Sequence, residues 1–308
     1  MKKPELLVTP VTVDDIIPLA ETGADAFVVG EQRYGLRLAG EFSRDDVEKA
    51  VELAHSKGKK VYVAMNALFH NDKVPELNDY IDFVHRAGAD AIIFGDPAVL
   101  MAVRETAPEM KLHWSTETTA TNWYACNYWG RKGAKRAVLA REINMEACIE
   151  IKRHAEVEIE IQIHGMTAMF QSKRTLLRNY FEYQGRKMNV ERIKGKNMFL
   201  YDPERDAKYP IFEDENGTHI MSPNDVCMID ELQDLIEAGI DSFKIDGIMK
   251  DSSYIEKVTG LYRRAIDLCV DDPDGYEREK DELYRKIEAI QPPNRPLDRG
   301  FFFKETVY

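Results

Sequence analysis

Four segments of the chain share one pattern, in which a helical stretch ends at or near a glycine and a short apolar run follows. They are ETGADAFVVG (21–30), RAGADAIIFGD (86–96), RKGAKRAVLA (131–140) and EAGIDSFKIDG (237–247). Glycine adopts the left-handed conformation that closes a helix at little cost. Runs rich in β-branched and aromatic residues are typical of buried strands. The pattern predicts a repeated unit of helix, turn and strand.

The rest of the chain extends this alternation to eight strands and eight helices. Strands are expected at 5–9, 26–30, 60–66, 91–95, 111–117, 136–140, 157–164 and 242–246, and helices at 13–22, 44–57, 75–87, 97–106, 121–132, 144–154, 225–238 and 252–269. Ser43 before Asp46, and Ser222-Pro223 before Asp225, have the spacing of helix caps. Eight such units predict a closed (β/α)8 barrel of the TIM type. The alternative, an open doubly wound sheet, is disfavoured by the number of units and by the lack of GxGxxG after the first strand.

Two segments fall outside the eight units. Residues 166–221 separate the seventh strand from its helix, whereas such connections usually have about 2–6 residues. We interpret this insertion as a lid or binding subdomain within a barrel domain of residues 1–270. Residues 271–308 contain a charged helix (276–289), a proline-rich turn and a tail, and we expect them to pack on the barrel.

Composition and charge narrow the class of protein. The 308 residues carry a net charge of −12, which argues against a surface that is basic all over. No apolar run is long enough to span a membrane, and the start, MKKPELLVTP, lacks the apolar core of a secretory signal. The four cysteines are far apart and form no CxxC pair. A reduced, cytoplasmic protein is the expectation.

Alternation within the strands predicts a polar barrel interior. In the seventh strand the isoleucines alternate with Glu158, Glu160, Gln162 and His164, and the eighth strand carries Lys244 and Asp246. Alternate residues of a strand face opposite sides, so the apolar set should meet the outer helices. Buried charges must pair or change their pKa values. One interpretation is a structural ion network, for example between Glu160 and Lys244.

The other interpretation is catalytic, because barrel enzymes place their chemistry at the carboxyl ends of the strands. The acids and bases expected there are Glu117, His164, Asp96 and Asp246. The residues expected to line a substrate pocket are Arg33, Tyr34, Asn66, Arg141, Glu142 and Lys244. His164, Glu160 and Asp96 could also hold a divalent metal ion, although they come from separate strands.

Absent motifs restrict the chemistry further. The sequence has no HExxH, no GxSxG and no Walker A loop. The expected state of Cys126, Cys148, Cys227 and Cys269 is a buried structural thiol, with a nucleophile as the less favoured alternative.

The insertion differs in charge from the rest of the chain. Residues 171–200 contain eight basic and two acidic residues, a net charge of +6, with aromatic residues among them. Basic groups neutralise phosphates, and aromatic rings stack on unpaired bases. The segment predicts an RNA-binding surface, with a solvated loop as the alternative. The residues expected to contact RNA are Lys173, Arg174, Arg178, Tyr180, Arg186 and Lys187.

Several motifs together resemble a known family. They are GEQRYGLRLAGEFS, KKVYVAMNALFHN, IQIHGM followed by QSKRTLLRNYF, SPNDVCMIDELQDLIEAGIDSFKIDGIMK and the final NRPLDRGFFFKETVY. These segments, spread over the whole chain, resemble the collagenase-like peptidases, peptidase family U32. The likeness is greatest to the shorter of two family members found in Firmicutes.

The resemblance implies two different activities. The family name implies a peptidase of unassigned mechanism, while some members take part in 5-hydroxylation of the tRNA wobble uridine, which draws on prephenate. Well-studied members also hold an iron–sulfur cluster on four cysteines, three after the HG of the seventh strand and one in the SxxDxC block. Here only Cys227 matches, since the segment after HG contains no cysteine. One thiolate cannot hold such a cluster, so none is expected in this chain.

Three hypotheses follow from the sequence. In the first, the chain helps to hydroxylate tRNA, alone or with a longer paralogue, and Arg33 and Arg141 clamp a small acidic donor. In the second, it is a peptidase acting on a peptide substrate, with an activated nucleophile or a metal-bound water. In the third, it is a non-catalytic partner of the paralogue.

Overall fold

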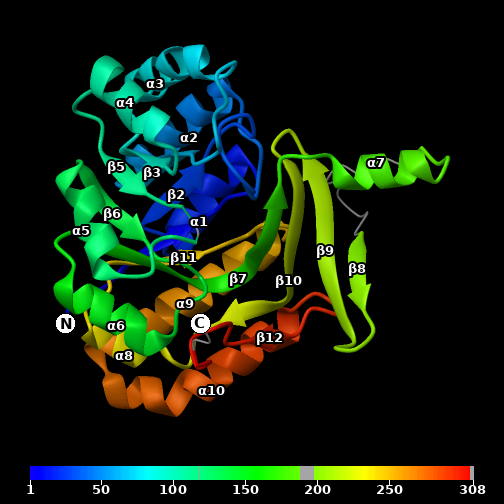
Figure 1. The fold of residues 1–308 in the computed structure, drawn as a ribbon. Coiled ribbons are helices and arrows are strands. Elements are labelled where there is room, and N and C mark those ends of the chain that lie inside the picture. Colours follow the sequence, from blue (N-terminus) through cyan, green and yellow to red (C-terminus); the bar gives the residue numbers. More distant parts are fainter. Residues whose placement is uncertain (117, 188–197, 306–308) are drawn as a thin grey trace.

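The computed structural model describes residues 1–116, 118–187 and 198–305 and shows a closed barrel with an attached sheet (Figure 1). The eight barrel strands are β1 (Glu5–Val8), β2 (Ala26–Val29), β3 (Lys60–Met65), β4 (Ala91–Phe94), β5 (Leu112–Trp114), β6 (Ala134–Val138), β7 (Glu158–Ser172) and β11 (Ser242–Ile245). Neighbouring strands are parallel, and β11 pairs with both β1 and β7, which closes the ring. The predicted (β/α)8 fold is confirmed.

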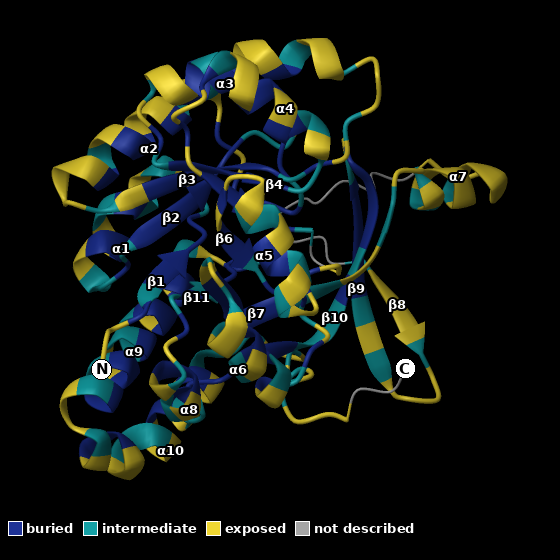
Figure 2. Cartoon of the chain, turned by 60° about the vertical axis from the view of Figure 1, so that its left-hand side comes forward, coloured by how far each residue is buried: buried dark blue, intermediate teal, exposed yellow. Residues whose placement is uncertain are grey.

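Helices surround this ring and bury their inner faces against it (Figure 2). They are α1 (Ile16–Thr22), α2 (Arg44–Ser56), α3 (Leu77–Arg86), α4 (Pro97–Thr106), α5 (Trp123–Arg131), α6 (Met145–His154), α8 (Leu232–Glu237) and α9 (Ser252–Asp271), with 3-10 turns at Val13–Asp15 and Val74–Glu76. The predicted cap at Ser43 is present, because its side chain accepts the Asp46 N–H while the Asp46 carboxylate accepts the Ser43 N–H. Strand residues such as Phe27, Trp114 and Ile161 pack outward into the main apolar core.

The insertion is a sheet rather than a loop. Strand β7 continues beyond the barrel to Ser172, and α7 (Leu176–Tyr183), β8 (Phe199–Asp202), β9 (Ala207–Asp214) and β10 (Gly217–Cys227) follow it. β10 runs antiparallel to the outer half of β7 and to β9, and β8 pairs with β9. Figure 1 shows this sheet standing away from the barrel, with α7 projecting from it. We call residues 166–227 the extension.

The helix predicted over 225–238 is therefore wrong in its first half. Asp225 and Cys227 belong to β10, where they pair with Met166 and His164 of β7, and α8 begins only at Leu232. The Ser222-Pro223 pattern is not a helix cap, since it lies inside a strand whose ladder shifts register there. Pairing with a distant strand thus overrides the local helical pattern.

The C-terminal segment covers the barrel beside the extension. Helix α10 (Pro273–Ile290) packs on α9, and β12 (Leu297–Asp298) adds a parallel strand to β10. Asp225 is fully buried at this junction, where Lys250 and Arg295 donate to its carboxylate. Although burial alone would raise the pKa of Asp225, these two cations hold it below its ordinary value. No helix among the described residues is long and apolar enough to cross a membrane.

Candidate functional site

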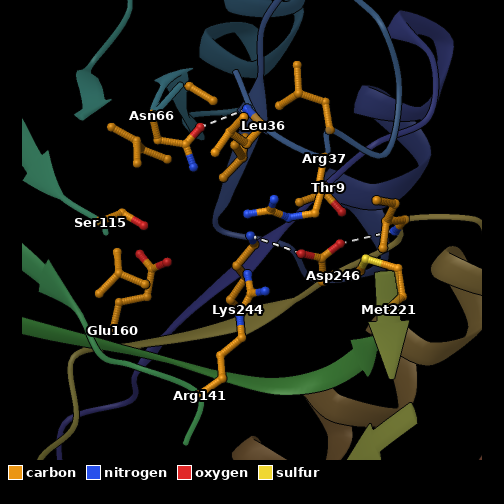
Figure 3. A pocket seen from close by; sticks show the side chains of 16 residues that line it. Thr9, Leu36, Arg37, Asn66, Ser115, Arg141, Glu160, Met221, Lys244 and Asp246 are labelled. Carbon is orange, nitrogen blue, oxygen red and sulfur yellow. Dashed lines mark hydrogen bonds and ion pairs between the residues drawn. The ribbon is translucent and has the colours of Figure 1, made fainter. Parts of the chain in front are cut away.

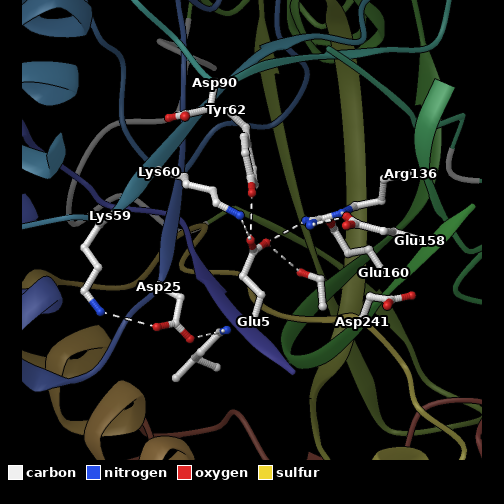
Figure 4. A network of polar contacts seen from close by, with 12 residues as sticks. Glu5, Asp25, Lys59, Lys60, Tyr62, Asp90, Arg136, Glu158, Glu160 and Asp241 are labelled. Carbon is white, nitrogen blue, oxygen red and sulfur yellow. Dashed lines mark hydrogen bonds and ion pairs between the residues drawn. The ribbon is translucent and has the colours of Figure 1, made fainter. Parts of the chain in front are cut away.

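The amino-terminal end of the barrel is closed by a network of ion pairs (Figure 4). Arg136 of β6 donates through Nη1 to Glu5 Oε1 at 2.6 Å and to Glu160 Oε2 at 3.2 Å, and through Nη2 to Glu158 Oε2 at 2.8 Å. The Tyr62 hydroxyl donates to the other Glu5 oxygen at 2.7 Å. The predicted ion network inside the barrel is present, but the ion-pair partner of Glu160 is Arg136 rather than Lys244.

A pocket opens at the other end, where the strands have their carboxyl termini (Figure 3). Four of the predicted site residues lie together in its lining: Asn66, Arg141, Lys244 and Asp246. They follow or end β3, β6 and β11, so the ring of parallel strands brings them to one place. The remaining lining residues are Thr9, Val28, Leu36, Arg37, Leu38, Ala64, Ile93, Ser115, Val138, Glu160, Met221 and Ile248.

Hydrogen bonds fix the polar groups of this pocket. Lys244 Nζ lies 3.1 Å from Asp246 Oδ2, and Asp246 Oδ1 accepts the Ile248 N–H at 3.0 Å. Asn66 Oδ1 accepts the Leu36 N–H at 2.9 Å, which ties the end of β3 to the loop after β2. The pocket therefore presents an ordered ammonium–carboxylate pair that can bind a polar ligand or move a proton.

An open groove continues from the pocket to the surface. It shares Arg37, Asn66 and Arg141 with the pocket and adds Glu142, so a fifth predicted residue lies near the site. Its rim includes Leu68, Met169 and Phe170, which are large apolar side chains exposed to solvent. A flat apolar group could rest on this rim while a polar part enters the pocket.

His164 does not face the barrel interior, contrary to the prediction. The pairing of β7 with β11 shifts between Lys244 and Ile245, so one extra β7 residue turns the His164 side chain outward. Its Nε2 lies 2.8 Å from the Tyr254 hydroxyl, and Tyr262 lies on its other side. Burial lowers the pKa of His164 to about 3, so the imidazole is a neutral core group.

Three further predicted residues have other structural roles. Asp96 is the N-cap of α4, where its oxygens accept the Ala98 N–H at 2.9 Å and the Phe69 N–H at 3.0 Å. Arg33 forms a two-pronged ion pair with Glu76 on the surface, outside the pocket. Tyr34 is buried and stacks on Tyr80 with ring centroids 3.8 Å apart. Glu117 lies outside the described residues.

The five basic residues and the tyrosine predicted to contact RNA lie on the extension, at the turn after β7, on α7 and just beyond it. All six are exposed: Lys173, Arg174, Arg178, Tyr180, Arg186 and Lys187. Tyr183 on the same helix is 90% exposed. Farther along, Lys208 lies over the exposed ring of Phe199, with Nζ 5.1 Å from its centroid. Arg192, Lys194 and Lys196, which contribute to the predicted charge, fall outside the described residues.

Two polar side chains at this site are not among the predicted residues. Arg37 lies in the loop after β2 and lines both the pocket and the groove, and His219 of β10 contacts it. The loop has no periodic pattern, and the start of the β10 segment lies in the insertion over 166–221, for which the sequence predicts a lid or binding subdomain without assigning strands. The only sequence signal was the density of polar residues that follows β2.

The cysteine set does not fit an iron–sulfur cluster. Cys227 Sγ is buried beside the Tyr262 hydroxyl at 3.6 Å, and burial raises the pKa of this thiol to about 11. Cys126, Cys148 and Cys269 lie in the helices α5, α6 and α9. Within the part of the chain that the structure describes, no group of three or more histidine, cysteine or acidic side chains could hold a metal ion.

Comparison with known proteins gives consistent matches. Residues 12–307 match the sequence profile of peptidase family U32. The tRNA hydroxylation protein P2 of Bacillus subtilis is 70% identical over the full length of both chains. The tRNA hydroxylation protein P1 of the same bacterium is 33% identical over 98% of this chain and 71% of its own. A dihydrodipicolinate synthase from Bacillus anthracis shares the fold, with a TM-score of 0.51, 8% identity and coverage of 95% and 85%.

Proposed function

Because the chain belongs to peptidase family U32, we propose that it acts in the hydroxylation of tRNA, at carbon 5 of the wobble uridine. The observation that carries the proposal is the 70% identity, over the whole of both chains, with a tRNA hydroxylation protein. The same proposal places the chain in the cytoplasm, where tRNA is modified.

The barrel mouth supports this function through its shape and charge. A uridine ring would rest on the groove rim, where the 47% exposed Phe170 offers a stacking face. A small acidic donor, prephenate in the family resemblance, would lie in the groove with a carboxylate entering the narrower pocket beside Arg141 and Lys244. Asp246, bound to Lys244, would serve as the acid–base group, and Glu142 would contact the substrate in the groove.

The extension would hold the rest of the tRNA. Its exposed arginine and lysine side chains would neutralise phosphates, and Tyr180 would stack on an unpaired base of the anticodon loop. α7 and the groove rim are linked through the outer half of β7, which carries Phe170. The target base and its flanking nucleotides would thus contact one continuous piece of the chain.

The oxidation itself requires a second component. Replacing the C5–H bond of uridine with C5–OH removes two electrons, and the cysteines of this chain do not fit the family's cluster. We therefore propose that a longer family member, such as the P1 type, works with this chain and supplies the centre that accepts these two electrons, while this chain binds and orients the substrates.

A peptidase is the second candidate, and only the family name favours it. Peptide cleavage needs a nucleophile with a base beside it, or a metal-bound water. Among the described residues lining the pocket, the hydroxyl side chains are Thr9 and Ser115, and no imidazole accompanies them. The described geometry gives this candidate less support than tRNA hydroxylation.

Nucleoside mass spectrometry would test the proposal directly. Total tRNA would be compared between a strain that lacks this gene and the same strain carrying it, each with and without the longer paralogue. We expect the wobble nucleosides derived from 5-hydroxyuridine to disappear and to return only when both genes are present. Unchanged nucleosides in the deletion strain would reject the function. Restoration without the paralogue would reject the proposed partnership alone.

The RNA-binding surface can be tested separately. Lys173→Glu with Arg174→Glu should weaken tRNA binding and reduce the slope of log affinity against log salt by about 1.4, because each lost phosphate contact on a single strand contributes about 0.7. Filter binding at a series of salt concentrations measures both. Lys257→Glu with Arg285→Glu, on exposed positions of α9 and α10, makes the same charge change away from the extension. An equal loss of tRNA affinity in the two double variants would contradict a specific RNA-binding surface on the extension.

A further inference from the structure

The extension reaches back to the barrel mouth through a buried histidine. His219 of β10 is fully buried, and its ring stacks on Phe212 of β9 with centroids 5.0 Å apart. Its Nε2 lies 2.8 Å from Asp214 Oδ1, and its Nδ1 lies 3.2 Å from Arg37 Nη1. Arg37 and His219 are 182 positions apart in the sequence. The imidazole therefore links the turn between β9 and β10 with the loop after β2.

Hydrogen-bond chemistry fixes the state of this imidazole. A guanidinium can only donate, so His219 Nδ1 must be the acceptor of the Arg37 N–H. The ring proton is then on Nε2, from which it is donated to Asp214. Although burial would raise the pKa of Asp214, its bond with His219 and the Asn216 N–H hold that pKa below its ordinary value. An ionised Asp214 thus selects the tautomer that can hold Arg37.

The turn between β9 and β10 also forms hydrogen bonds with the backbone around Arg37. The Asn216 side-chain amide donates to the Gln32 carbonyl at 2.7 Å and to the Gly35 carbonyl at 3.3 Å. Gln171 Oε1, at the outer end of β7, accepts from Arg37 Nη1 at 3.3 Å. Arg37 itself has a left-handed backbone with φ of +50°, a conformation that a non-glycine residue adopts only when its surroundings impose it.

The Arg37 side chain, which these contacts hold in place, lines the pocket. Arg37 is 6% exposed and lines the cavity with Arg141 and Lys244, and Figure 3 shows it among the side chains that surround the cavity. A planar guanidinium fixed at such a wall is suited to a carboxylate or a phosphate, which it can bind through two parallel hydrogen bonds.

We propose that Arg37 binds the anionic group of the pocket's ligand and that His219, oriented by Asp214, is a positioning residue that holds the Arg37 guanidinium in place. The extension then does more than contact RNA, since it also completes the binding site inside the barrel. This inference rests on the proposed function for the reaction concerned, but the binding of an anion can be measured without it.

Anion binding by purified protein provides the test. Calorimetric titration with inorganic phosphate and, separately, with malonate at constant ionic strength distinguishes the two anion chemistries. We expect the wild type to bind at least one of the two anions with a millimolar dissociation constant. Arg37→Met should bind neither anion. His219→Phe keeps the stacked ring but removes both hydrogen bonds, so it should weaken binding about tenfold. His219→Gln, which can accept from Arg37 and donate to Asp214, should stay within about twofold of the wild type.

A double variant shows whether His219 acts through Arg37. Arg37→Met with His219→Phe should behave as Arg37→Met alone. If His219→Phe does not fold, Asp214→Asn takes its place, because the amide no longer selects the Nε2–H tautomer and binding should again weaken severalfold. Nitrogen-15 spectra should show Nδ1 of His219 unprotonated in the wild type. Wild-type binding in both His219→Phe and Asp214→Asn, no anion binding by the wild type, or a protonated Nδ1 would overturn the proposal.

The cellular assay separates this inference from the function. In the nucleoside experiment, His219→Phe should lower the 5-hydroxyuridine-derived nucleosides and His219→Gln should restore them. If the wild-type gene does not affect tRNA while His219→Phe still weakens anion binding, the function fails and the inference stands. If the wild type restores the nucleosides and His219→Phe does so equally well, the function stands and the inference fails.

Discussion

The two ends of the barrel use the same kinds of side chain in opposite ways. At the amino-terminal end, Arg136 is surrounded by Glu5, Glu158 and Glu160, and its side chain is 3% exposed. At the carboxyl end, Lys244 and Asp246 pair with each other at the edge of a cavity. The members of the first set bond mainly to one another, and only Glu160 among them also lines the pocket, whereas Lys244 and Asp246 both border a space that a ligand can fill.

The difference shows that buried charge alone does not identify a functional site. Glu160 is as deeply buried as a catalytic acid would be, and burial raises its pKa, yet it bonds to Arg136 in the closed network. Glu160 also lines the cavity, but its ion-pair partner Arg136 does not, whereas both members of the Lys244–Asp246 pair do. Removing a charge should therefore affect mainly stability at the first end and mainly function at the second.

The largest effect is expected from Arg136→Met. This change leaves Glu160 buried without its ion-pair partner and Glu5 with only Lys60, which should cost about 3–5 kcal/mol in the free energy of unfolding. Urea denaturation followed by circular dichroism measures it. Arg264→Met, which breaks an exposed pair with Glu279, is the control and should cost at most about 1 kcal/mol. Similar losses in the two variants would contradict the structural role of Arg136.

An intermediate effect, on function rather than stability, is expected from Lys244→Met. The cellular level of 5-hydroxyuridine-derived nucleosides should fall at least about tenfold, a change of about 1.4 kcal/mol, because the pocket loses a cation and the partner of Asp246. Nucleoside mass spectrometry measures it. Arg33→Met removes a cation outside the pocket and should leave the level unchanged. Equal losses of these nucleosides in Lys244→Met and Arg33→Met would show that the pocket has no special role in the reaction.

The smallest effect concerns the acid range. Although burial would raise the pKa of Glu5, Arg136 and the Tyr62 hydroxyl hold it below its ordinary value of 4.5. Glu5 thus stabilises the fold above that pH and loses this contribution as the pH falls through its lower folded value. The stability gap between wild type and Glu5→Gln should be constant near neutrality and narrow below pH 4.5, by at most about 1.4 kcal/mol per pH unit. A gap that widens in acid would contradict the assignment.

The sequence was sufficient to predict the barrel, because the same local signals recur in four of its units. Helix ends at Gly23, Gly88, Gly133 and Gly239 are each followed by a buried strand, and the strand ends then place Asn66, Arg141, Lys244 and Asp246 in one ring without any knowledge of contacts. The residues that the fold itself carries to the mouth were therefore predictable.

Non-local pairing determines the parts that the sequence missed. One extra residue in β7 turns His164 outward, and nothing in its neighbours marks the bulge. Asp96 comes just after a strand, as Asn66 does. Its carboxylate, however, caps the next helix instead of facing the pocket. The contact between Arg37 and His219 depends on where β10 pairs, and that pairing joins segments more than forty positions apart. Periodicity carries no information on such contacts.

The continuity of β7 has a consequence for how this protein can diversify. One strand forms part of the barrel wall at its start and carries the extension at its end, and at Gly165 it passes so close to Asp246 that a Cβ atom would meet the Asp246 carbonyl oxygen. Exchange of the whole extension between relatives would cut through a hydrogen-bonded ladder and leave two strand edges without partners. Point substitutions on its exposed face disturb no ladder. New substrate preferences should therefore arise in this lineage by single replacements rather than by recombination of modules.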